Sequence, residues 1–486
     1  MKVFNTLTGR VEEFEPLNNR QVGIYACGVT VYDLCHIGHA RSAVVFDVIV
    51  RYLRYKGYEV TFVRNFTDID DKIINRANKE GLSWKEVAEK YTEEYYKDMD
   101  RLGILRADIE PKATEHIKEM IEIIQKLVEK GYAYEVDEGE AKSVYFSVEK
   151  FPQYGKLSKK KIDELMSGAR VEVDERKKSP LDFALWKASK PGEPWWDSPW
   201  GKGRPGWHIE CSAMSIKYLG ETFDIHGGGA DLIFPHHENE IAQSEAFTGK
   251  PFAKYWIHNG FVTINKEKMS KSLGNVLNIR DLLELYDAEA LRLFLLSSHY
   301  RSPIEFSHEY LKEAEATLDR VYSTIMRIED FEKVEPKDKS SLDLSKISSE
   351  LKSLRPEFEK AMDDDFNTAK ALGIIFEFVK ELNRFMDKKP SSKEELNLLF
   401  TSKETIQKLG SILNLFQRTP IQWYRDLLKT KKIEITEEDI NRLIDERTQA
   451  RKNKDWQKAD SIRQELLSKG IILEDKPERT IWKVKV

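Results

Sequence analysis

The spacing of apolar residues changes along the first part of the chain. Residues 22–27, VGIYAC, form a short apolar run that ends at Gly28. Between Ile37 and Gly57 the apolar residues recur at helical spacing, and β-branched and aromatic residues return at 58–66. A strand, a helix and a second strand in this order predict a parallel βαβ unit. We expect its ligand site at the carboxyl ends of the strands.

The pattern changes again in the middle of the chain. Residues 72–131 have the spacing of helices, whereas residues 132–200 show no regular period. Helix, strand and helix patterns resume between 207 and 249, with Pro235 at the first position of the last helix, and a strand region follows at 254–264. We therefore expect the middle segment to interrupt a parallel-sheet domain.

Helical patterns dominate beyond about residue 280. Apolar residues at 311–328 alternate three- and four-residue spacings, which is typical of a helical bundle. Residues 334–350 and 387–395 are rich in Pro, Lys and Ser and indicate loops, and the last unit, 421–486, ends in a predicted hairpin. The fold class is therefore α/β: a Rossmann-like parallel sheet with an insertion, followed by a helical bundle and a small α+β domain.

Composition limits the classes of protein that the chain can belong to. With 486 residues the chain is longer than one hydrophobic core usually supports, which predicts several domains. Its three cysteines exclude a disulfide framework and favour a reducing, cytoplasmic setting. No apolar run approaches the roughly 20 residues that span a bilayer, so we expect no membrane partner. The net charge is −5, but basic clusters at 156–161 and 450–454 permit RNA binding without showing it.

Two histidines begin the first predicted helix. His36 and His39, in HIGH, are three residues apart, so both can face one ligand. Backbone N–H groups at a helix N-terminus favour anions, and two imidazole donors would stabilise negative charge that develops on a phosphate. The alternative is a pair of surface histidines in a turn.

Two further segments have the composition of phosphate-binding loops. Lys268 and Lys271 lie three apart in NKEKMSKSLGN, which has the composition of a loop that closes over a polyphosphate. The glycines of HGGGADL, Gly227, Gly228 and Gly229, would let the backbone approach a ligand closely. A glycine run alone is weak evidence, but this one follows a predicted strand.

HIGH at 36–39 and KMSKS at 268–272, in this order around a parallel α/β pattern, resemble the paired signatures of class I aminoacyl-tRNA synthetases. Finer motifs resemble the cysteinyl-tRNA synthetases over essentially the whole chain: YACGVTVYDLCHIGHARS, NFTDIDDKII, PGWHIECSAM, HGGGADLIFPHHENEIAQSEA and DWQKADSIRQELLSKGIILEDKPERTIWK. The resemblance implies an enzyme that activates L-cysteine with ATP, as its Mg²⁺ complex, to cysteinyl adenylate and pyrophosphate. Cysteine would then pass to the 3′-terminal adenosine of tRNA(Cys).

Cysteine selection gives this enzyme a chemical reason to hold zinc. Shape and hydrogen bonding discriminate near-isosteres such as cysteine and serine only about 10²-fold, whereas zinc prefers a thiolate. The resemblance places the ligands of one zinc ion on Cys27, Cys211, His236 and Glu240. His236 and Glu240 are four apart and share a helix face, while His237 would share its face with Ile241 and is the poorer candidate.

Other interpretations of these residues stay open. The same four residues would also form a closed structural zinc site, and without a metal Cys211 would be a buried small residue and HHENE a solvated helix start. Cys35 is assigned to packing. The aspartates of TDIDDK, at 68, 70 and 71, are interpreted mainly as helix-start residues rather than a magnesium site.

The resemblance also assigns roles to residues of the amino-acid and ATP sites. Gly28, Thr67 and Trp207 match positions around the bound cysteine, although Trp207 is equally compatible with a core position. His36 and His39 would stabilise the transition state, and Lys268 and Lys271 the leaving pyrophosphate. The ATP site would comprise His36, Gly38, His39, Gly227, Gly228, Gly229, Asp231 and Lys271.

The expected domain order follows from these motifs. It comprises a catalytic domain in two halves (1–115 and 201–264) around a connective insertion (116–200), the KMSKS loop with a stem-contact region (265–310), a tRNA-binding helical bundle (311–420) and a small anticodon-binding domain (421–486). A helix–turn at 447–456 is the expected anticodon segment. We expect a monomer. The rival functions are a ligase that joins cysteine to a small amine and a non-catalytic RNA-binding paralogue.

Overall fold

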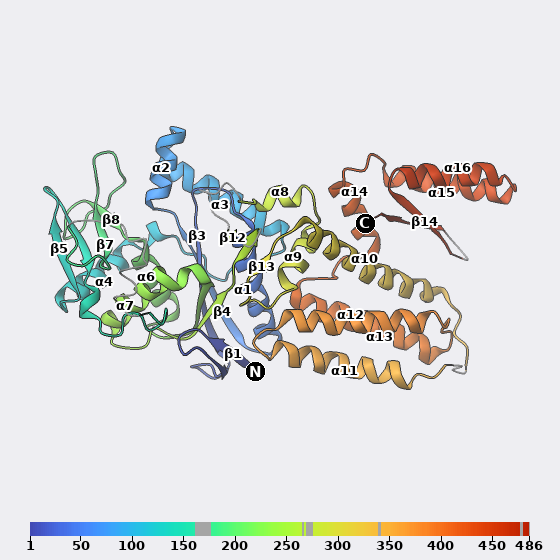
Figure 1. Ribbon diagram of the computed structural model, residues 1–486, viewed down its shortest axis with the longest axis horizontal. Helices are drawn as coiled ribbons and strands as arrows, with labels where there is room; N and C mark the ends of the chain where they lie inside the picture. Colours follow the sequence, from blue (N-terminus) through green and yellow to red (C-terminus); the bar gives the residue numbers. More distant parts are fainter. Residues whose placement is uncertain (161–175, 265–266, 269–275, 339–341, 477–479, 486) are drawn as a thin grey trace. The chain divides into compact units, whose positions relative to one another are not determined.

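The computed structural model describes residues 1–160, 176–264, 267–268, 276–338, 342–476 and 480–485 (Figure 1). The chain divides into two compact units. The first unit comprises Met1–Val276, Ser298–Glu305 and Met362–Asn367, and the second comprises Leu277–Ser297, Phe306–Ala361 and Thr368–Val486.

A four-stranded parallel sheet forms the centre of the first unit. Its strand order is β10–β9–β3–β4, and its strands are β3 (Gln21–Thr30), β4 (Glu59–Thr67), β9 (Phe223–Gly229) and β10 (Ala253–Asn259). Helix α1 (Ile37–Tyr55) connects β3 to β4, and Gly57 ends the turn after it with φ 87°. The predicted βαβ unit and α/β class are therefore confirmed.

Helices α6 (Trp207–Leu219) and α7 (Glu238–Thr248) pack against each other beside this sheet. They are interleaved in sequence with β9 and β10, and residues of both helices join the apolar cluster that contains Tyr25 of β3. The carboxyl ends of β3 and β9 consequently lie near the first turns of α1 and α6.

The middle segment is more regular than the sequence pattern indicates. An antiparallel sheet of β5 (Ala133–Asp137), β6 (Lys142–Phe146), β7 (Phe183–Ala188) and β8 (Gly203–Pro205) occupies it. The expectation of an irregular segment was wrong because strands of three to six residues, with a long gap between β6 and β7, are too short to establish a period of two.

Further helices and several short strands lie in the described part of the first unit. The region expected to be helical contains α2 (Asp71–Glu80), α3 (Trp84–Arg101) and α4 (Ile117–Glu129). The expected strand region at 254–264 divides after Asn259: β11 (Val262–Ile264) pairs with β12 (Glu267–Lys268) and β13 (Ile304–Glu305) instead of continuing the parallel sheet. Strands β1 (Lys2–Asn5) and β2 (Arg10–Glu13) pair with each other.

The described residues of the second unit are helical apart from a C-terminal hairpin, as the sequence predicts, but α11 and α13 begin inside the segments 334–350 and 387–395 that were expected to be loops. Its helices are α8 (Ile279–Leu283), α9 (Ala288–Leu296), α10 (His308–Asp330), α11 (Ser345–Met362), α12 (Thr368–Met386), α13 (Lys393–Leu413), α14 (Pro420–Thr430), α15 (Glu437–Lys452) and α16 (Trp456–Ser468). The hairpin consists of β14 (Ile471–Asp475) and β15 (Thr480–Val484). In the described part of the chain, no helix is long and apolar enough to cross a membrane.

Candidate active site

His36 and His39 cap the helix that they begin. Nδ1 of His36 accepts a hydrogen bond from the Gly38 N–H at 3.1 Å, and Nδ1 of His39 accepts one from the His36 N–H at 3.1 Å. The two rings stack with their centroids 3.8 Å apart. Because each Nδ1 accepts, the proton of each neutral ring is assigned to Nε2, which makes Nε2–H the donor of each ring.

One cleft brings many of the predicted residues together. Among the residues predicted to form the site, it is lined by Cys27, Gly28, His36, Gly38, His39, Trp207, Gly229 and Asp231, and Cys35, which was assigned to packing, lines it as well. Thr67, Gly227 and Gly228 are not among the described residues that line it. The cleft thus joins the two histidines to the predicted amino-acid pocket.

Sequence reasoning missed other residues of this wall. They include Tyr32, Arg64, Lys72, Tyr95 and Asn259. Lys72 is the last residue of the TDIDDK segment, Arg64 lies three residues before it, and Tyr32 precedes the HIGH motif, so proximity to a motif was the available signal. Tyr95 lies on α3 and is not next to any of the motifs, so the sequence gave no signal for it.

Glycine is required at positions 28 and 227 for different structural reasons. A side chain at Gly28 would overlap the backbone carbonyl of Asn65, so β3 and β4 need glycine there. A side chain at Gly227 would overlap Ile257 and the ring of Phe46, which is a packing requirement between the sheet and α1. The close approach at Gly227 is therefore to protein rather than to the cleft.

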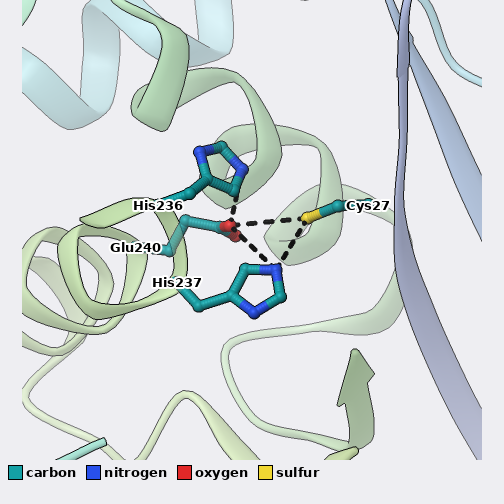
Figure 2. Close-up of side chains that lie close together, drawn as sticks. All are labelled: Cys27, His236, His237 and Glu240. Atoms are coloured by element: carbon teal, nitrogen blue, oxygen red, sulfur yellow. Dashed lines mark hydrogen bonds and ion pairs between the residues drawn. The ribbon is translucent and has the colours of Figure 1, made fainter. Parts of the chain in front are cut away.

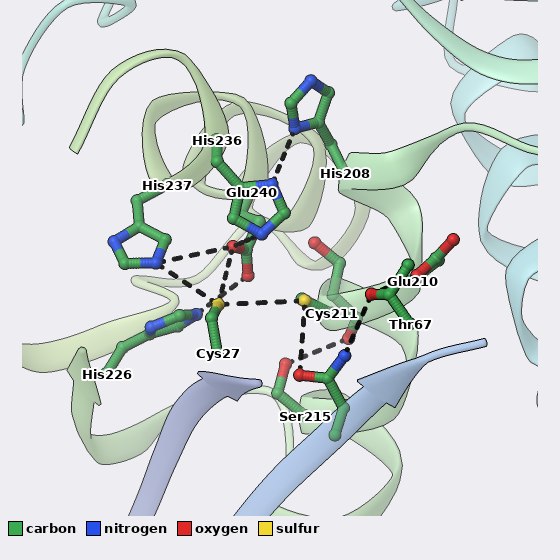
Figure 3. A network of polar contacts seen from close by, with 12 residues as sticks. Cys27, Thr67, His208, Glu210, Cys211, Ser215, His226, His236, His237 and Glu240 are labelled. Carbon is green, nitrogen blue, oxygen red and sulfur yellow. Dashed lines mark hydrogen bonds and ion pairs between the residues drawn. The ribbon is translucent and has the colours of Figure 1, made fainter. Parts of the chain in front are cut away.

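Metal-ligating side chains meet behind the cleft. Ligand atoms of Cys27, His236, His237 and Glu240 all lie within 4.8 Å of one another (Figure 2). Glu240 Oε1 is 2.9 Å from His236 Nε2 and 3.5 Å from Cys27 Sγ, and His237 Nε2 is 3.3 Å from the same sulfur. Cys211 joins this group, with its Sγ 3.8 Å from Cys27 Sγ (Figure 3).

The position of His237 differs from the argument made on helix faces. Residues Ile233–His237 form a wide turn with a cis Phe234–Pro235 peptide and a non-helical Phe234, and the regular helix begins at Glu238. The expected helix start at Pro235 was wrong by three residues. Since helical spacing does not apply across this turn, His237 faces Cys27 and Glu240 beside His236.

Burial and charge in this cluster suit a cation. Cys211, His236, His237 and Glu240 are at most 2% exposed. Burial, Cys211 and Glu240 raise the pKa of Cys27 well above its usual value. Burial opposes charge on His236, but the neighbouring Glu240 and Cys211 raise its pKa to about 10. Two thiols and a carboxylate enclosed with two imidazoles fit a zinc ion chemically.

Further histidines orient the members of this cluster. His226 Nε2 lies 2.8 Å from Glu240 Oε2, and His208 Nδ1 lies 2.9 Å from His236 Nδ1 (Figure 3). The latter contact turns Nε2 of His236 toward Glu240. Such outer partners fix the orientation of metal ligands, and isolated histidines at 208 and 226 carry no spacing pattern from which this role follows.

The predicted substrate residues Thr67 and Trp207 have distinct surroundings. Trp207 lines the cleft and stacks on the ring of His236 with centroids 4.1 Å apart. Thr67 is 2% exposed, and its hydroxyl donates to Glu210 at 2.9 Å (Figure 3). Burial and the neighbouring Cys211 raise the pKa of Glu210 well above its usual value.

The three aspartates of TDIDDK have structural partners. Asp68 accepts hydrogen bonds from the backbone and hydroxyl of Thr114, Asp70 caps α2, and Asp71 pairs with Lys187 at 2.7 Å and with Arg204. Their interpretation as residues of a helix start is confirmed for Asp70.

The remaining predicted residues belong to other elements or lie outside the described residues. Lys268 forms part of β12, whereas Lys271 lies outside the described residues. In the expected anticodon segment, Arg447 forms a two-pronged ion pair with Asp475 at 2.7 and 2.9 Å, and Trp456 is 58% exposed at the start of α16.

Comparisons with known proteins agree with this architecture. The family model for the class I (C) tRNA synthetase catalytic domain matches residues 13–316, a DALR domain model matches 357–417, and the cysteinyl-tRNA ligase anticodon-binding domain model matches 436–482. The solved structure of a Mycobacterium tuberculosis methionyl-tRNA synthetase in complex with methionyl-adenylate has a similar fold. Its TM-score is 0.61 at 15% identity, over 83% of this chain and 93% of that chain.

Fold and catalytic-domain match together define a class I aminoacyl-tRNA synthetase. Relatives that match over their full length identify the family within this class. A cysteine–tRNA ligase of Thermodesulfovibrio yellowstonii is 85% identical over 486 residues, and one of Geobacter metallireducens is 56% identical over 488, each with both chains fully covered. The chain belongs to the cysteinyl-tRNA synthetase family.

Proposed function

We propose that this enzyme activates L-cysteine with ATP and transfers it to the 3′-terminal adenosine of tRNA(Cys), and that the residues described above carry both steps. The observation that supports these roles best is the shared cleft. It joins His36 and His39, at the carboxyl edge of the parallel sheet, to Cys27, the outermost member of the metal-ligating cluster.

Cys27, Cys211, His236 and Glu240 would hold one zinc ion, and His237 is the competing fifth donor. When bound, zinc supplies a soft Lewis acid that coordinates the thiolate of cysteine and is a poor match for the hydroxyl of serine. Trp207, stacked on His236, would form an apolar wall of the amino-acid pocket, and Gly28 would contribute backbone beside it.

Adenylate formation depends on positioned donors. The carboxylate of cysteine attacks the α-phosphate of ATP, which binds as its Mg²⁺ complex, and pyrophosphate leaves. The Nε2–H groups of His36 and His39 would donate to the phosphate as negative charge develops. Lys268 and Lys271 would neutralise the pyrophosphate, and Gly229 and Asp231 would line the ATP site, with Gly227 and Gly228 shaping the strand end behind them.

Transfer to tRNA would use the rest of the chain. The 2′-hydroxyl of the terminal ribose attacks the adenylate carbonyl, as class I chemistry implies. The helical bundle and the small C-terminal domain would bind the tRNA, with the helix–turn at 447–456 placed at the anticodon. We also propose that the enzyme acts as a monomer.

The test is cysteine-dependent exchange of pyrophosphate into ATP, followed by charging of tRNA(Cys) with radiolabelled cysteine. The proposal requires both activities. Exchange without charging, together with transfer of cysteine to a small amine, would favour the ligase alternative. Binding of tRNA without exchange would favour a non-catalytic RNA-binding protein.

A further inference from the structure

One wall of the cleft carries two cations that have no role in the reaction described above. Arg64 of β4 and Lys72 of α2 line the cleft together with Tyr32 and Tyr95. Arg64 is 6% exposed, whereas Lys72 is an exposed residue. A Cβ atom added at Gly28 would lie 3.4 Å from Cγ of Arg64, so this side chain passes close to the end of β3.

Neither cation has an anionic partner among the residues that the structure describes. Arg64 Nη1 donates to the Tyr95 hydroxyl at 3.5 Å, and the guanidinium lies 5.0 Å from the centroid of the Phe62 ring. The ammonium group of Lys72 lies 5.5 Å from the centroid of the Tyr32 ring. All of these contacts are with neutral groups. A buried guanidinium normally faces a carboxylate or a phosphate.

The carboxylates closest to these cations in the sequence or in the cleft have other partners. Asp68 is hydrogen-bonded to Thr114, and Asp71 forms two ion pairs with other cations. Asp33, which also lines the cleft, lies 3.9 Å from Arg76. The two cations of the wall are thus suited to an anion that enters the cleft.

The three substrates of the proposed reaction bring different anions into this cleft. The phosphates of ATP are assigned to His36, His39 and the lysines of the KMSKS motif, and the carboxylate of cysteine loses its charge when the adenylate forms. The terminal adenosine of the tRNA must then place its 2′-hydroxyl at the adenylate carbonyl, and it carries a phosphodiester on its 5′ side. Among these anions, the phosphodiester is the one without an assigned partner.

We propose that Arg64 and Lys72 bind this phosphodiester and thereby form a subsite for the 3′ end of the tRNA. The proposal rests on the function proposed above. The planar guanidinium suits bidentate contact with two phosphate oxygens, and the ammonium group of Lys72 adds a point charge. Tyr95 would hold the guanidinium through its hydroxyl. The subsite would therefore be filled in the transfer step and not in the activation step.

The experiment compares two RNAs: tRNA(Cys) with its complete 3′ end, and tRNA(Cys) that lacks the terminal nucleotide and its phosphate. Dissociation constants are measured by filter binding on the zinc-loaded full-length protein, with the sulfamoyl analogue of cysteinyl adenylate at saturation. In Lys72→Met and in Arg64→Met, affinity for the complete tRNA should fall about tenfold, the value of one hydrogen bond to a charged group. Affinity for the truncated tRNA should change less than about twofold.

Two further measurements test the chemistry of this contact. For the complete tRNA, the slope of log Kd against log salt concentration should decrease in magnitude by about 0.7 in each variant, as for loss of one contact to a single-stranded phosphate. Arg64→Lys keeps a cation at the wall and should retain the affinity within about threefold.

Pyrophosphate exchange separates the tRNA subsite from the sites of the activation step, because exchange needs no tRNA. In all three variants, KM for cysteine and KM for ATP should change less than about threefold. Exchange also reports on folding of the catalytic unit. Because Lys72 is exposed, its replacement tests the inference even where the loss of the buried Arg64 prevents folding.

Lys79→Met is the matched control for Lys72→Met. Lys79 is an exposed lysine of the same helix and is not among the described residues that line the cleft. Its replacement should leave both RNA affinities and pyrophosphate exchange unchanged.

Two results would overturn the inference. Equal weakening of both RNAs would place the contact away from the 3′ end, and a raised KM for cysteine or ATP would assign the cations to the activation step. If the wild-type protein exchanges pyrophosphate and charges tRNA(Cys) while the variants give one of these results, the inference alone fails and the proposed function stands. A wild-type protein without exchange would remove the proposed function and this inference with it.

Discussion

The sulfur atoms of Cys27 and Cys211 lie 3.8 Å apart, although the residues are separated by 184 positions in the sequence. Cys27 comes from the end of β3 and Cys211 from the first turns of α6. Burial and the neighbouring Cys211 and Glu240 raise the pKa of Cys27, so a cation would be needed to hold both sulfur atoms as thiolates in this site. This pair is therefore the structural core of the proposed zinc site.

Removal of the metal should lower the preference for cysteine over serine. Stripping zinc with a chelator should lower cysteine-dependent pyrophosphate exchange and reduce the ratio of cysteine to serine activation toward the roughly 10²-fold that shape alone supplies. Adding zinc back should restore both quantities. Unchanged selectivity in metal-free protein would contradict the role of zinc.

The two adjacent histidines should differ as ligands. His236→Asn should reduce bound zinc per chain and weaken the thiolate-to-metal absorption of the cobalt-substituted protein. His237→Asn should retain near-stoichiometric metal, because Cys27, Cys211, His236 and Glu240 remain as donors. Metal loss in His237→Asn with retention in His236→Asn would reverse the assignment.

His36→Asn should separate catalysis from helix capping. Asparagine is a strong N-cap residue and can accept from the Gly38 N–H, so the melting temperature should change little. The variant lacks the imidazole Nε2–H donor, and kcat for pyrophosphate exchange should fall on the order of 10²-fold, as for loss of one donor to a developing charge. An unaltered kcat would exclude His36 from the reaction.

Gly28→Ala should disrupt the amino-acid pocket. The added methyl group would overlap the Asn65 carbonyl, so β3 and β4 must separate and the Gly28–Asn65 hydrogen bond must lengthen. We expect a lower melting temperature and a raised KM for cysteine. Gly23→Ala in the same strand is the control, since its nearest neighbour is the flexible end of Leu219 at 3.3 Å. Similar effects in both variants would indicate general strand damage.

Trp456→Ala should affect tRNA charging alone. Trp456 is 58% exposed, so its removal should leave stability and pyrophosphate exchange unchanged while the KM for tRNA(Cys) rises roughly tenfold, the range found for loss of one stacked base. Arg447→Ala should instead destabilise the C-terminal hairpin, because Arg447 is 4% exposed and its guanidinium pairs with Asp475 of β14. A tRNA KM unchanged in Trp456→Ala would remove this residue from the interface.

The sequence determined the local elements and the family. Helical spacing from Ile37 to Gly57 and the β-branched run at 58–66 predicted α1 and β4, because period and propensity are properties of neighbouring residues. The HIGH and KMSKS motifs indicated the family because they too are short runs of neighbouring residues. Short strands at 133–205 carried too little local pattern and were missed.

Tertiary structure decided which distant side chains meet. The wide turn at 233–237 brought His237 beside His236, although the helix-face argument had made His237 the poorer candidate, and folding placed His226 and His208 against members of the metal-ligating cluster. It also joined Asn65 and Thr67 of β4 to Glu210 of α6. Such contacts depend on the packing of whole elements and on irregular backbone, and neither is encoded in the spacing of residues along one segment.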